Sequence, residues 1–174
     1  MNRHVVVTGA GSGIGLQIAL RFADLGEELT LVDISEPALG EAAKKSEARG
    51  ASAVSIQSVD LRTPQGPGSM IDKAWDVAPI DVLINSAGVY PSTPFLSLDV
   101  ETWNSVLDLN TRAPMLATVA LARRAVSGQR GASVVNISSS AAQRARPGAA
   151  PYSTSKAALE MLTRASALEL AGLS

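Results

Sequence analysis

The sequence predicts a doubly wound α/β fold, in which a parallel sheet is covered by helices on both faces. Short apolar segments alternate with stretches of helical periodicity throughout the 174 residues. The cores of these segments, such as Val5–Val7 and Val82–Ile84, are continuous apolar runs. A strand buried on both faces shows such a run, whereas a half-buried strand alternates apolar and polar residues. Regular alternation of strand and helix therefore favours a three-layer α/β/α arrangement.

Five strands are expected from the apolar segments. Their ranges are His4–Thr8, Leu29–Asp33, Ala53–Gln57, Asp81–Asn85 and Ser133–Ser138. No internal repeat or linker divides the chain, which is interpreted as one domain over residues 1–174.

Helices are predicted between these strands. The first ends at Gly26 and has an apolar face at helical spacing, formed by Ile14, Ile18, Phe22 and Leu25. Ser35 is suited to cap the second, because Pro37 follows in the first turn, and this helix extends to Gly50. The third is expected to begin late, near Ser69, since the residues before it are poor helix formers.

Two longer helices are predicted in the second half of the chain. One extends from Asp99 to about Ser127 with a bend near Pro114, because proline interrupts helical hydrogen bonding. The other begins around Pro151 and has one apolar face, formed by Ala158, Met161, Leu162, Ala165 and Leu168.

The composition excludes several classes of protein. Hydrophobic residues make up 46% and charged residues 18% of the chain, which favours a globular fold over disorder. The 15 basic and 16 acidic residues include no dense basic stretch, so neither nucleic acid nor a membrane is expected as a partner. The absence of cysteine and the single histidine, His4, argue against a metal site. No signal peptide is recognised, and a cytoplasmic location is expected.

A glycine-rich loop, Thr8–Gly15, lies directly between the first strand and the first helix. Glycine permits a sharp turn and a close approach of a ligand to the main chain. The helix that follows offers unpaired N–H groups and a positive dipole end to a phosphate. The run departs from the G-x-G-x-x-G spacing, and a glycine-rich turn without a ligand is the alternative. Its position between strand and helix favours a pyrophosphate site.

Asp33 ends the second strand, 18 residues beyond Gly15. A carboxylate at this place can accept hydrogen bonds from both adenosine ribose hydroxyls and would repel a 2′-phosphate. Its neighbours Ile34 and Ser35 are uncharged, as is Ser12 in the loop. The pattern therefore predicts NAD rather than NADP, the alternative being a solvated carboxylate at a strand end.

Tyr152 and Lys156 are spaced by one turn at the start of the last helix, so they share a face. A free tyrosine has a pKa of about 10 and is a poor base near neutrality. A nearby ammonium group favours the phenolate, which makes the pair suited to exchange a proton between an alcohol and a ketone. Such a pair is common by chance on helix surfaces, so its context decides.

The motifs together resemble the short-chain dehydrogenase/reductase family, in the subgroup with T-G-x-x-x-G-x-G and Tyr-x-x-x-Lys motifs. Thr8–Gly15 matches the first motif in full, and Tyr152–Lys156 matches the second. Asp60 matches the adenine-contacting aspartate, and Asn85–Gly88 matches Asn-Asn-Ala-Gly with one change. The matches occur in family order along the whole chain, which implies a Rossmann-type sheet with strand order 3-2-1-4-5-6.

The resemblance implies roles for individual residues. Tyr152 would exchange the proton with the substrate oxygen, and Lys156 would lower the tyrosine pKa and hold the nicotinamide ribose. Ser139, which stands 13 residues before Tyr152, would bind the substrate oxygen, and Asn110 would order a proton-relay water. The neighbouring hydroxyls of Ser138 and Ser140 are interpreted as loop caps. The residues implied to bind NAD are Gly9, Gly11, Ser12, Gly13, Ile14, Gly15, Asp33, Asp60, Leu61, Asn85, Ala87, Gly88, Tyr152 and Lys156.

The implied activity is hydride transfer between NAD and a small secondary alcohol or ketone, in a homo-oligomer paired through the two long helices. The alternative is a non-catalytic, truncated dinucleotide-binding protein. Ser86 replaces the second asparagine of the family segment, so part of the hydrogen bonding between strands is expected to be lost or replaced by water, while the backbone contacts of Ala87 and Gly88 are expected to remain. The family continues after Gly172 with a sixth strand, a substrate lid and a seventh strand, which are absent here, so the isolated chain is expected to lack turnover.

Two further groups lie near the expected substrate pocket. The apolar residues Val89, Tyr90, Phe95 and Leu96 follow the fourth strand, where they either line the pocket or anchor the loop. Arg144 and Arg146 follow the fifth strand, and a solvated loop is the expected setting, with contact to an anionic substrate as the alternative.

Overall fold

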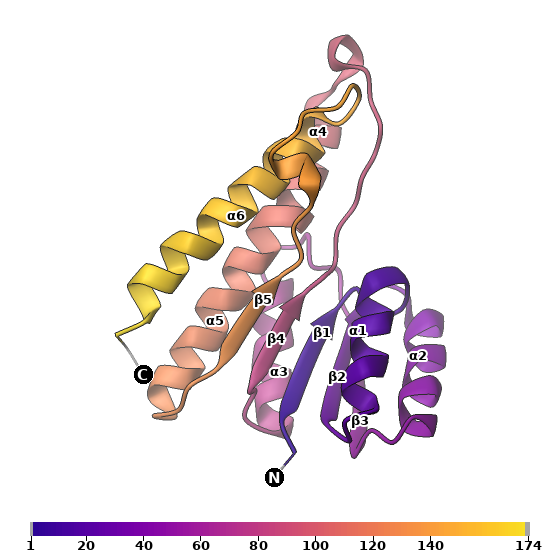
Figure 1. The fold of residues 1–174 in the computed structure, drawn as a ribbon, viewed down its shortest axis with the longest axis vertical. Helices are drawn as coiled ribbons and strands as arrows, with labels where there is room; N and C mark the ends of the chain where they lie inside the picture. Colours follow the sequence, from indigo (N-terminus) through magenta and orange to yellow (C-terminus); the bar gives the residue numbers. More distant parts are fainter. Residues whose placement is uncertain (1, 173–174) are drawn as a thin grey trace.

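The computed structural model describes residues 2–172 and contains a five-stranded parallel sheet with strand order β3-β2-β1-β4-β5 (Figure 1). The strands are β1 (His4–Thr8), β2 (Glu28–Asp33), β3 (Ala53–Ser58), β4 (Val82–Asn85) and β5 (Ser133–Asn136). The helices are α1 (Gly13–Ala23), α2 (Glu36–Ala48), α3 (Gly66–Val77), α4 (Val100–Leu107), α5 (Ala113–Ser127) and α6 (Ala150–Leu170). The predicted doubly wound α/β fold is confirmed.

Two hydrophobic cores lie on the two faces of the sheet. Val5 and Val7 of β1 are fully buried in the core that receives α1 and α2, where Leu39 packs. Val6, between them, is fully buried in the opposite core with Met70 of α3 and Leu121 of α5. Because successive side chains of a strand point to opposite faces, β1 needs apolar residues at consecutive positions. This explains the continuous apolar run in the sequence.

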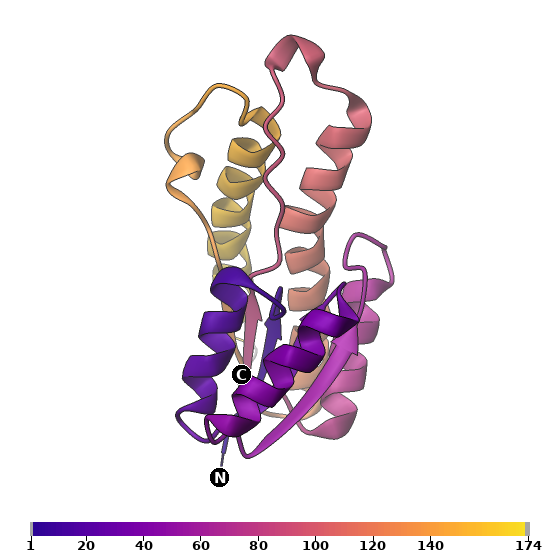
Figure 2. The ribbon, with the colours of Figure 1, turned by 90° about the vertical axis from the view of Figure 1, so that its right-hand side faces the viewer.

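The upper half of the molecule extends beyond the carboxyl ends of the strands (Figures 1 and 2). It contains α4, the first turns of α6 and the loops that follow β4 and β5. The two loops are joined where the backbone N–H of Thr93 donates to the carbonyl of Gly148 at 3.0 Å. Ligands of doubly wound sheets bind at this end, where the strand order reverses between β1 and β4.

The limits of several elements agree with the sequence, and others differ by up to three residues, as at the end of α1, which lies at Ala23 rather than Gly26. Ser35 caps α2 as predicted, and its hydroxyl accepts a hydrogen bond from the N–H of Ala38 at 3.4 Å. α3 begins at Gly66 rather than near Ser69, because Pro67 occupies the first turn, where a missing N–H costs nothing. β5 is shorter than predicted and ends at Asn136, where its pairing with Asn85 of β4 also ends.

The buried faces of α1 and α6 differ from the predicted apolar faces. In α1, Ile14 is 63% exposed, and the buried positions are Gly15, Ala19, Leu20 and Ala23. In α6, Leu168 is 84% exposed, and the buried positions are Pro151, Ser155, Lys156 and Leu159. The predicted Ile18 and Phe22 of α1 do pack against the core, together with Leu20 and the small buried residues. The start of α6 is instead buried through polar residues as well as apolar ones. Apolar periodicity therefore identified the core-facing side of α1 only in part and did not identify the polar residues buried on α6.

The long helix is interrupted close to the predicted bend. α4 ends at Leu107, a π-helical turn covers Asp108–Arg112, and α5 begins at Ala113. Pro114 has no N–H to donate to the carbonyl of Asn110, four residues earlier, so the α-helical pattern cannot continue through this point. Such π-turns occur frequently at functional sites.

Candidate active site

A cleft of about 500 Å³ extends along the carboxyl ends of the strands. One end lies at Asp60 and Arg62, after β3, and the other lies at Tyr152 and Lys156 of α6. Twelve of the predicted residues line it: Gly9, Ser12, Gly13, Ile14, Gly15, Asp33, Asp60, Leu61, Ala87, Gly88, Tyr152 and Lys156. Predicted residues that do not line it are Gly11, Asn85, Asn110 and Ser139.

The glycine loop is packed too closely for side chains at several positions, Gly9 and Gly15 among them. A Cβ atom at Gly15 would lie 2.2 Å from the carbonyl oxygen of Gly9, so the start of α1 rests directly on the loop backbone. Gly9 has a φ of +67°, and a Cβ there would lie 2.9 Å from Cα of Ala87. Glycine at these positions brings the helix N-terminus and the loop after β4 to the same side of the cleft.

Asp33 is held in a fixed orientation at the end of β2. Its Oδ2 accepts a hydrogen bond from the N–H of Gly11 at 3.0 Å, and its Oδ1 accepts one from the N–H of Ser35 at 3.1 Å. Each carboxylate oxygen has room for a second hydrogen bond. The backbone therefore orients Asp33 and leaves acceptor positions for a ligand in the cleft.

Thr8 joins the glycine loop to the loop after β4, a role that the sequence analysis did not identify. Its hydroxyl donates to the carbonyl of Ile84 at 3.3 Å and accepts from the N–H groups of Ser86 and Ala87 at 3.0 and 3.1 Å. These bonds use backbone groups of β4 and its loop, so they do not depend on the side chain at position 86.

The side-chain link between β4 and β5 is supplied by Asn85, not by position 86. Its Nδ2 donates to Oδ1 of Asn136 at 2.8 Å, and Nδ2 of Asn136 donates to the hydroxyl of Thr163 at 2.8 Å. The chain of hydrogen bonds connects β4, β5 and α6. It retains a side-chain bond between the strands despite the serine at position 86.

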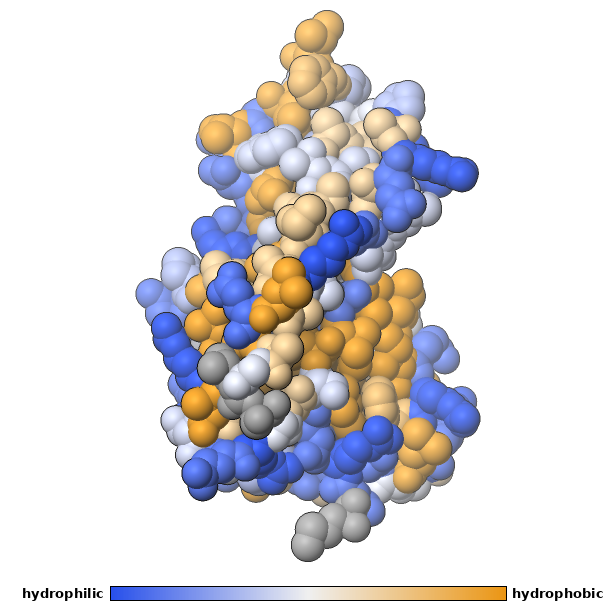
Figure 3. All heavy atoms as spheres, turned by 60° about the vertical axis from the view of Figure 1, so that its left-hand side comes forward, coloured by the Kyte–Doolittle hydropathy of each residue, from blue (hydrophilic) through white to orange (hydrophobic). Residues whose placement is uncertain are grey.

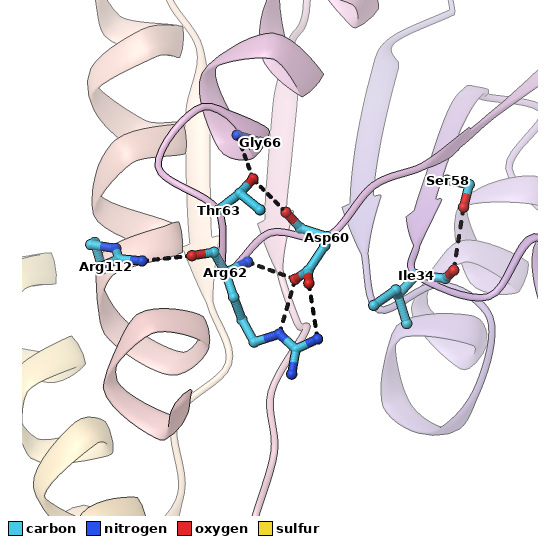
Figure 4. Close-up of polar contacts among 7 residues, drawn as sticks. All are labelled: Ile34, Ser58, Asp60, Arg62, Thr63, Gly66 and Arg112. Carbon is cyan, nitrogen blue, oxygen red and sulfur yellow. Dashed lines mark hydrogen bonds and ion pairs between the residues drawn. The ribbon is translucent and has the colours of Figure 1, made fainter. Parts of the chain in front are cut away.

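The outer end of the cleft contains an Asp60–Arg62 pair (Figure 4). The backbone N–H and Nε of Arg62 donate to Oδ1 of Asp60 at 2.9 and 3.0 Å, and Nη2 donates to Oδ2 at 2.9 Å. These bonds hold the pKa of Asp60 below its usual range, the side-chain bond from Arg62 being the largest cause. The hydroxyl of Thr63 donates to the carbonyl of Asp60 and accepts from the N–H of Gly66, which fixes the loop.

Tyr152 and Lys156 lie together at the inner end of the cleft. Nζ of Lys156 is 5.8 Å from the centroid of the Tyr152 ring and donates to the carbonyl of Ile137 at 2.7 Å. The lysine is 5% exposed, and this burial lowers its pKa. The ring of Tyr90 lies 4.6 Å from that of Tyr152, centroid to centroid, at an angle of 43°. The buried ammonium group of Lys156 and the ring of Tyr90 therefore lie beside Tyr152, the predicted proton donor.

Asn110 is fully buried beneath this end of the cleft. Its Oδ1 accepts from the N–H of Val89 at 2.9 Å, and its Nδ2 donates to the carbonyl of Val89 and the hydroxyl of Ser155. The carbonyl of Ser155 accepts in turn from the hydroxyl of Thr111 at 3.0 Å. Ser155, which lies between Tyr152 and Lys156 in α6, therefore attaches this helix to the π-helical turn. The sequence analysis did not identify this role.

The serines after β5 have different surroundings. Ser138 lines the cleft, and its hydroxyl donates to Glu160 of α6 at 2.9 Å. The hydroxyl of Ser139 accepts from the N–H of Ala141 at 3.2 Å and caps the short 3₁₀ turn Ser140–Ala142. Its hydroxyl proton is not used in that bond, so Ser139 can still donate to a ligand oxygen.

The loop residues considered in the sequence separate into two groups. Val89 and Tyr90 line the cleft, whereas Phe95 and Leu96 do not, and Leu96 is 99% exposed. Arg144 and Arg146 are exposed and do not line the cleft either.

Two negative findings hold for residues 2–172. Histidine, cysteine and carboxylate side chains form no group there that could hold a metal ion. No helix in the same range combines the length and the apolar character needed to cross a membrane.

The fold and the cleft define a doubly wound protein in which a glycine-rich loop and a pair formed by Tyr152 and the buried Lys156 line one cleft. The family described as short chain dehydrogenase matches residues 3–173, and the chain belongs to that family. Members of the family bind nicotinamide dinucleotides.

Curated relatives include enzymes of sugar acids and polyols. The chain is 31% identical over 169 residues to 5-keto-D-gluconate 5-reductase of Escherichia coli K12, which covers 97% of this chain and 66% of the relative. It is 38% identical over 168 residues to galactitol 2-dehydrogenase (L-tagatose-forming) of Cereibacter sphaeroides, and the match covers 95% of this chain and 65% of the relative. The chain thus spans just under two thirds of the length of these relatives.

Solved structures agree closely with the fold. A short chain dehydrogenase from Mycobacterium smegmatis has a TM-score of 0.94 at 30% identity, with 99% of this chain and 72% of that chain covered. A xylitol dehydrogenase described as NAD⁺-bound has a TM-score of 0.91 at 30% identity, and the match covers 99% of this chain and 66% of that chain. A Sphingobium yanoikuyae short-chain dehydrogenase in complex with NADPH has a TM-score of 0.89 at 32% identity, and the match covers 98% of this chain and 67% of that chain.

Proposed function

We propose that the protein is an NAD-dependent oxidoreductase that interconverts a small secondary alcohol and a ketone, with Tyr152 as the acid/base. The observation that carries this proposal is the position of Tyr152 and Lys156 in the same cleft as the glycine loop and Asp33. A dinucleotide bound with its pyrophosphate at the glycine loop and its ribose at Asp33 would extend toward Tyr152.

The choice of NAD rests on the charge around Asp33. A 2′-phosphate would face its carboxylate, which the backbone of Gly11 and Ser35 holds in place. The basic residues among those that line the cleft are Arg62, which is paired with Asp60, and Lys156, which lies at the opposite end. Structural neighbours bind either NAD⁺ or NADPH, so this choice depends on the residues of this chain.

The bound nicotinamide would supply the hydride acceptor or donor. The phenol of Tyr152 would hold or release the proton at the substrate oxygen, and the Lys156 ammonium would favour the phenolate through its positive charge. Burial lowers the pKa of Lys156, because removal from water disfavours the charged form of its amine. Ser139 would donate a hydrogen bond to the substrate oxygen.

Asn110 would act through its main chain. Its side chain is used in bonds to Val89 and Ser155. Its carbonyl receives no α-helical hydrogen bond from Pro114, which has no N–H. A proton-relay water near Lys156 would therefore bind this carbonyl rather than the side-chain amide.

For the substrate, we propose a small polyol or a related hydroxy acid, the classes named in the curated relatives. The substrate end of the cleft combines the hydroxyl groups of Tyr90, Ser138 and Tyr152, which suit a ligand with several hydroxyls. Non-catalytic dinucleotide binding is the second candidate. Tyr152, Lys156, Ser139 and Asn110 are all present, which favours the enzyme.

We also propose a cytoplasmic homo-oligomer that pairs through α5 and α6. An isologous contact needs an apolar, self-complementary face. Figure 3 shows hydrophobic side chains gathered beside α6, and Met161 and Leu168 of this helix are 59% and 84% exposed.

The experiment that tests the proposed function is fluorescence titration with NADH and NADPH, followed by turnover assays with NAD and a panel of polyols and aldonates. NADH should bind at least about ten-fold more tightly than NADPH, a difference of about 1.4 kcal/mol. Asp33→Asn should reduce this preference, because the charge facing the 2′ position is removed. Equal affinities in the unsubstituted protein would contradict the choice of NAD, and binding without turnover of any substrate would favour the second candidate.

A further inference from the structure

The carboxylate of Asp60 is almost completely occupied by Arg62 (Figure 4). Its Oδ1 accepts two hydrogen bonds, from the backbone N–H and Nε of Arg62, and its Oδ2 accepts one, from Nη2. An ionised carboxylate has about four acceptor positions, two on each oxygen. The pair therefore leaves Asp60 one acceptor position, on Oδ2, beside the cleft that Asp60 lines.

Arg62 is itself fixed from a distant part of the chain. Nη2 of Arg112 donates to the carbonyl of Arg62 at 2.6 Å, and Nη1 of Arg112 forms an ion pair with Asp108 at 2.7 Å. Asp108 and Arg112 are the first and last residues of the π-helical turn. The loop after β3 is thus attached to the turn before α5, which holds the backbone of Arg62 in place beside Asp60.

We propose that Arg62 is a positioning residue that makes Asp60 selective for the 6-amino group of adenine. The argument rests on the proposed function, because a dinucleotide with its ribose at Asp33 of β2 places its base beyond that strand, at the end of the neighbouring β3. An amino group donates to the remaining acceptor position of Asp60. A carbonyl oxygen at the same place, as in hypoxanthine, offers a second acceptor and is repelled.

Two properties of the Arg62 side chain suit this role. The guanidinium binds both carboxylate oxygens at once, which fixes the plane of the carboxylate as well as its charge. The same contact keeps the pKa of Asp60 low, so the group remains an acceptor across the neutral range. A lysine at this position would supply charge without fixing the plane.

The experiment compares the binding of NADH with that of its hypoxanthine analogue, in which a carbonyl replaces the 6-amino group, by nicotinamide fluorescence. The substitution is Arg62→Leu, and Arg62→Lys is a second variant that keeps the charge. Arg124→Leu is the matched control, because Arg124 of α5 forms an ion pair with Asp72 at 2.7 Å, is 40% exposed against 43% for Arg62, and does not line the cleft.

The unsubstituted protein should prefer NADH by about ten-fold, the size expected for one hydrogen bond to a charged group. Arg62→Leu should reduce this preference to about three-fold or less, Arg62→Lys should also reduce it, and Arg124→Leu should leave it unchanged. A loss of affinity in Arg62→Leu that is equal for both nucleotides would overturn the proposal, as would tight NADH binding without preference in the unsubstituted protein. Failure of the unsubstituted protein to bind either nucleotide would instead contradict the proposed function.

Discussion

The ammonium group of Lys156 is buried without a carboxylate partner, so we expect Lys156→Met to stabilise the folded protein. The side chain is 5% exposed and makes one hydrogen bond, to the carbonyl of Ile137. Lys156 takes part in none of the ion pairs found among residues 2–172. Burial of a charge without such compensation opposes folding, which is also why the pKa of Lys156 is lowered.

The expected gain is the difference between two opposing terms. Desolvation of an ammonium group costs several kcal/mol, and one hydrogen bond from a charged donor returns about 1.5–3 kcal/mol. Methionine has a similar length, fills the same space and removes both terms, while water in the cleft can reach the half-buried Ile137. We expect a net stabilisation of about 1–2 kcal/mol. In a chain of this size that corresponds to a rise in Tm of roughly 2–8 °C.

The effect should depend on pH in a defined direction. Below the lowered pKa of Lys156 the folded and unfolded states both carry the charge, so the full cost of burying it is present. As the pH rises from that pKa toward the ordinary lysine value of about 10.4, the folded state loses the proton first and the unsubstituted protein gains stability. The advantage of Lys156→Met should therefore be largest near neutrality and should shrink in alkaline buffer.

Thermal unfolding measured by circular dichroism across this pH range tests the prediction. Lys73→Met is the control, because Lys73 is an exposed lysine of α3 and its replacement should change the free energy of unfolding by no more than about 0.5 kcal/mol. A lower Tm for Lys156→Met than for the unsubstituted protein at neutral pH would refute the reasoning. It would show that the lysine stabilises the helix more than its desolvation opposes folding.

In an active form of the protein, Tyr152→Phe should lower kcat by about 10²–10⁴-fold, because it removes the proposed acid/base. The affinity for NADH should change little, because no charged group that could contact the cofactor is lost. Retention of most activity in steady-state assays would contradict this role. Thr163→Val should destabilise the fold by about 1–3 kcal/mol in denaturant titration, because Nδ2 of Asn136 loses its acceptor, whereas Thr163→Ser should not; equal effects would count against it. Gly15→Ala should lower the free energy of unfolding by about 3 kcal/mol or more, because its Cβ would meet the Gly9 carbonyl. Gly13→Ala, with no atom within 4 Å of its Cβ, should lower it by about 1 kcal/mol through its φ of +54°. Similar melting temperatures for the two variants would show that the loop backbone yields easily.

Most of the fold could be predicted from local patterns. The strands of a parallel sheet carry their own signal, because burial on both faces requires the continuous runs seen in Val5–Val7 and Val82–Ile84. The cap at Ser35 and the interruption near Pro114 also depend on residues close in sequence. The glycine loop was recognised for the same reason, because its glycines, strand and helix are contiguous.

The parts that could not be predicted depend on contacts between distant segments. The role of Thr8 requires the backbone at positions 84, 86 and 87, and that of Arg62 requires Arg112, 50 residues away. The start of α1 faces the cleft rather than the core, so the apolar Ile14 is exposed there. An apolar side chain at a ligand site gives the same periodic signal as one in a core, and only the fold separates the two.

The way in which α6 is attached explains why the apolar periodicity of the sequence did not predict its orientation. Consecutive residues at the end of β5 bind this helix by hydrogen bonds: Asn136 to Thr163, the carbonyl of Ile137 to Lys156, and Ser138 to Glu160. Apolar packing would allow the helix to rotate or slide at little cost, whereas each hydrogen bond fixes a distance and a direction. A catalytic group must be held to within about 0.5 Å of its working position. A polar attachment would meet that demand for Tyr152, the proposed acid/base, with residues whose pairing no local sequence pattern displays.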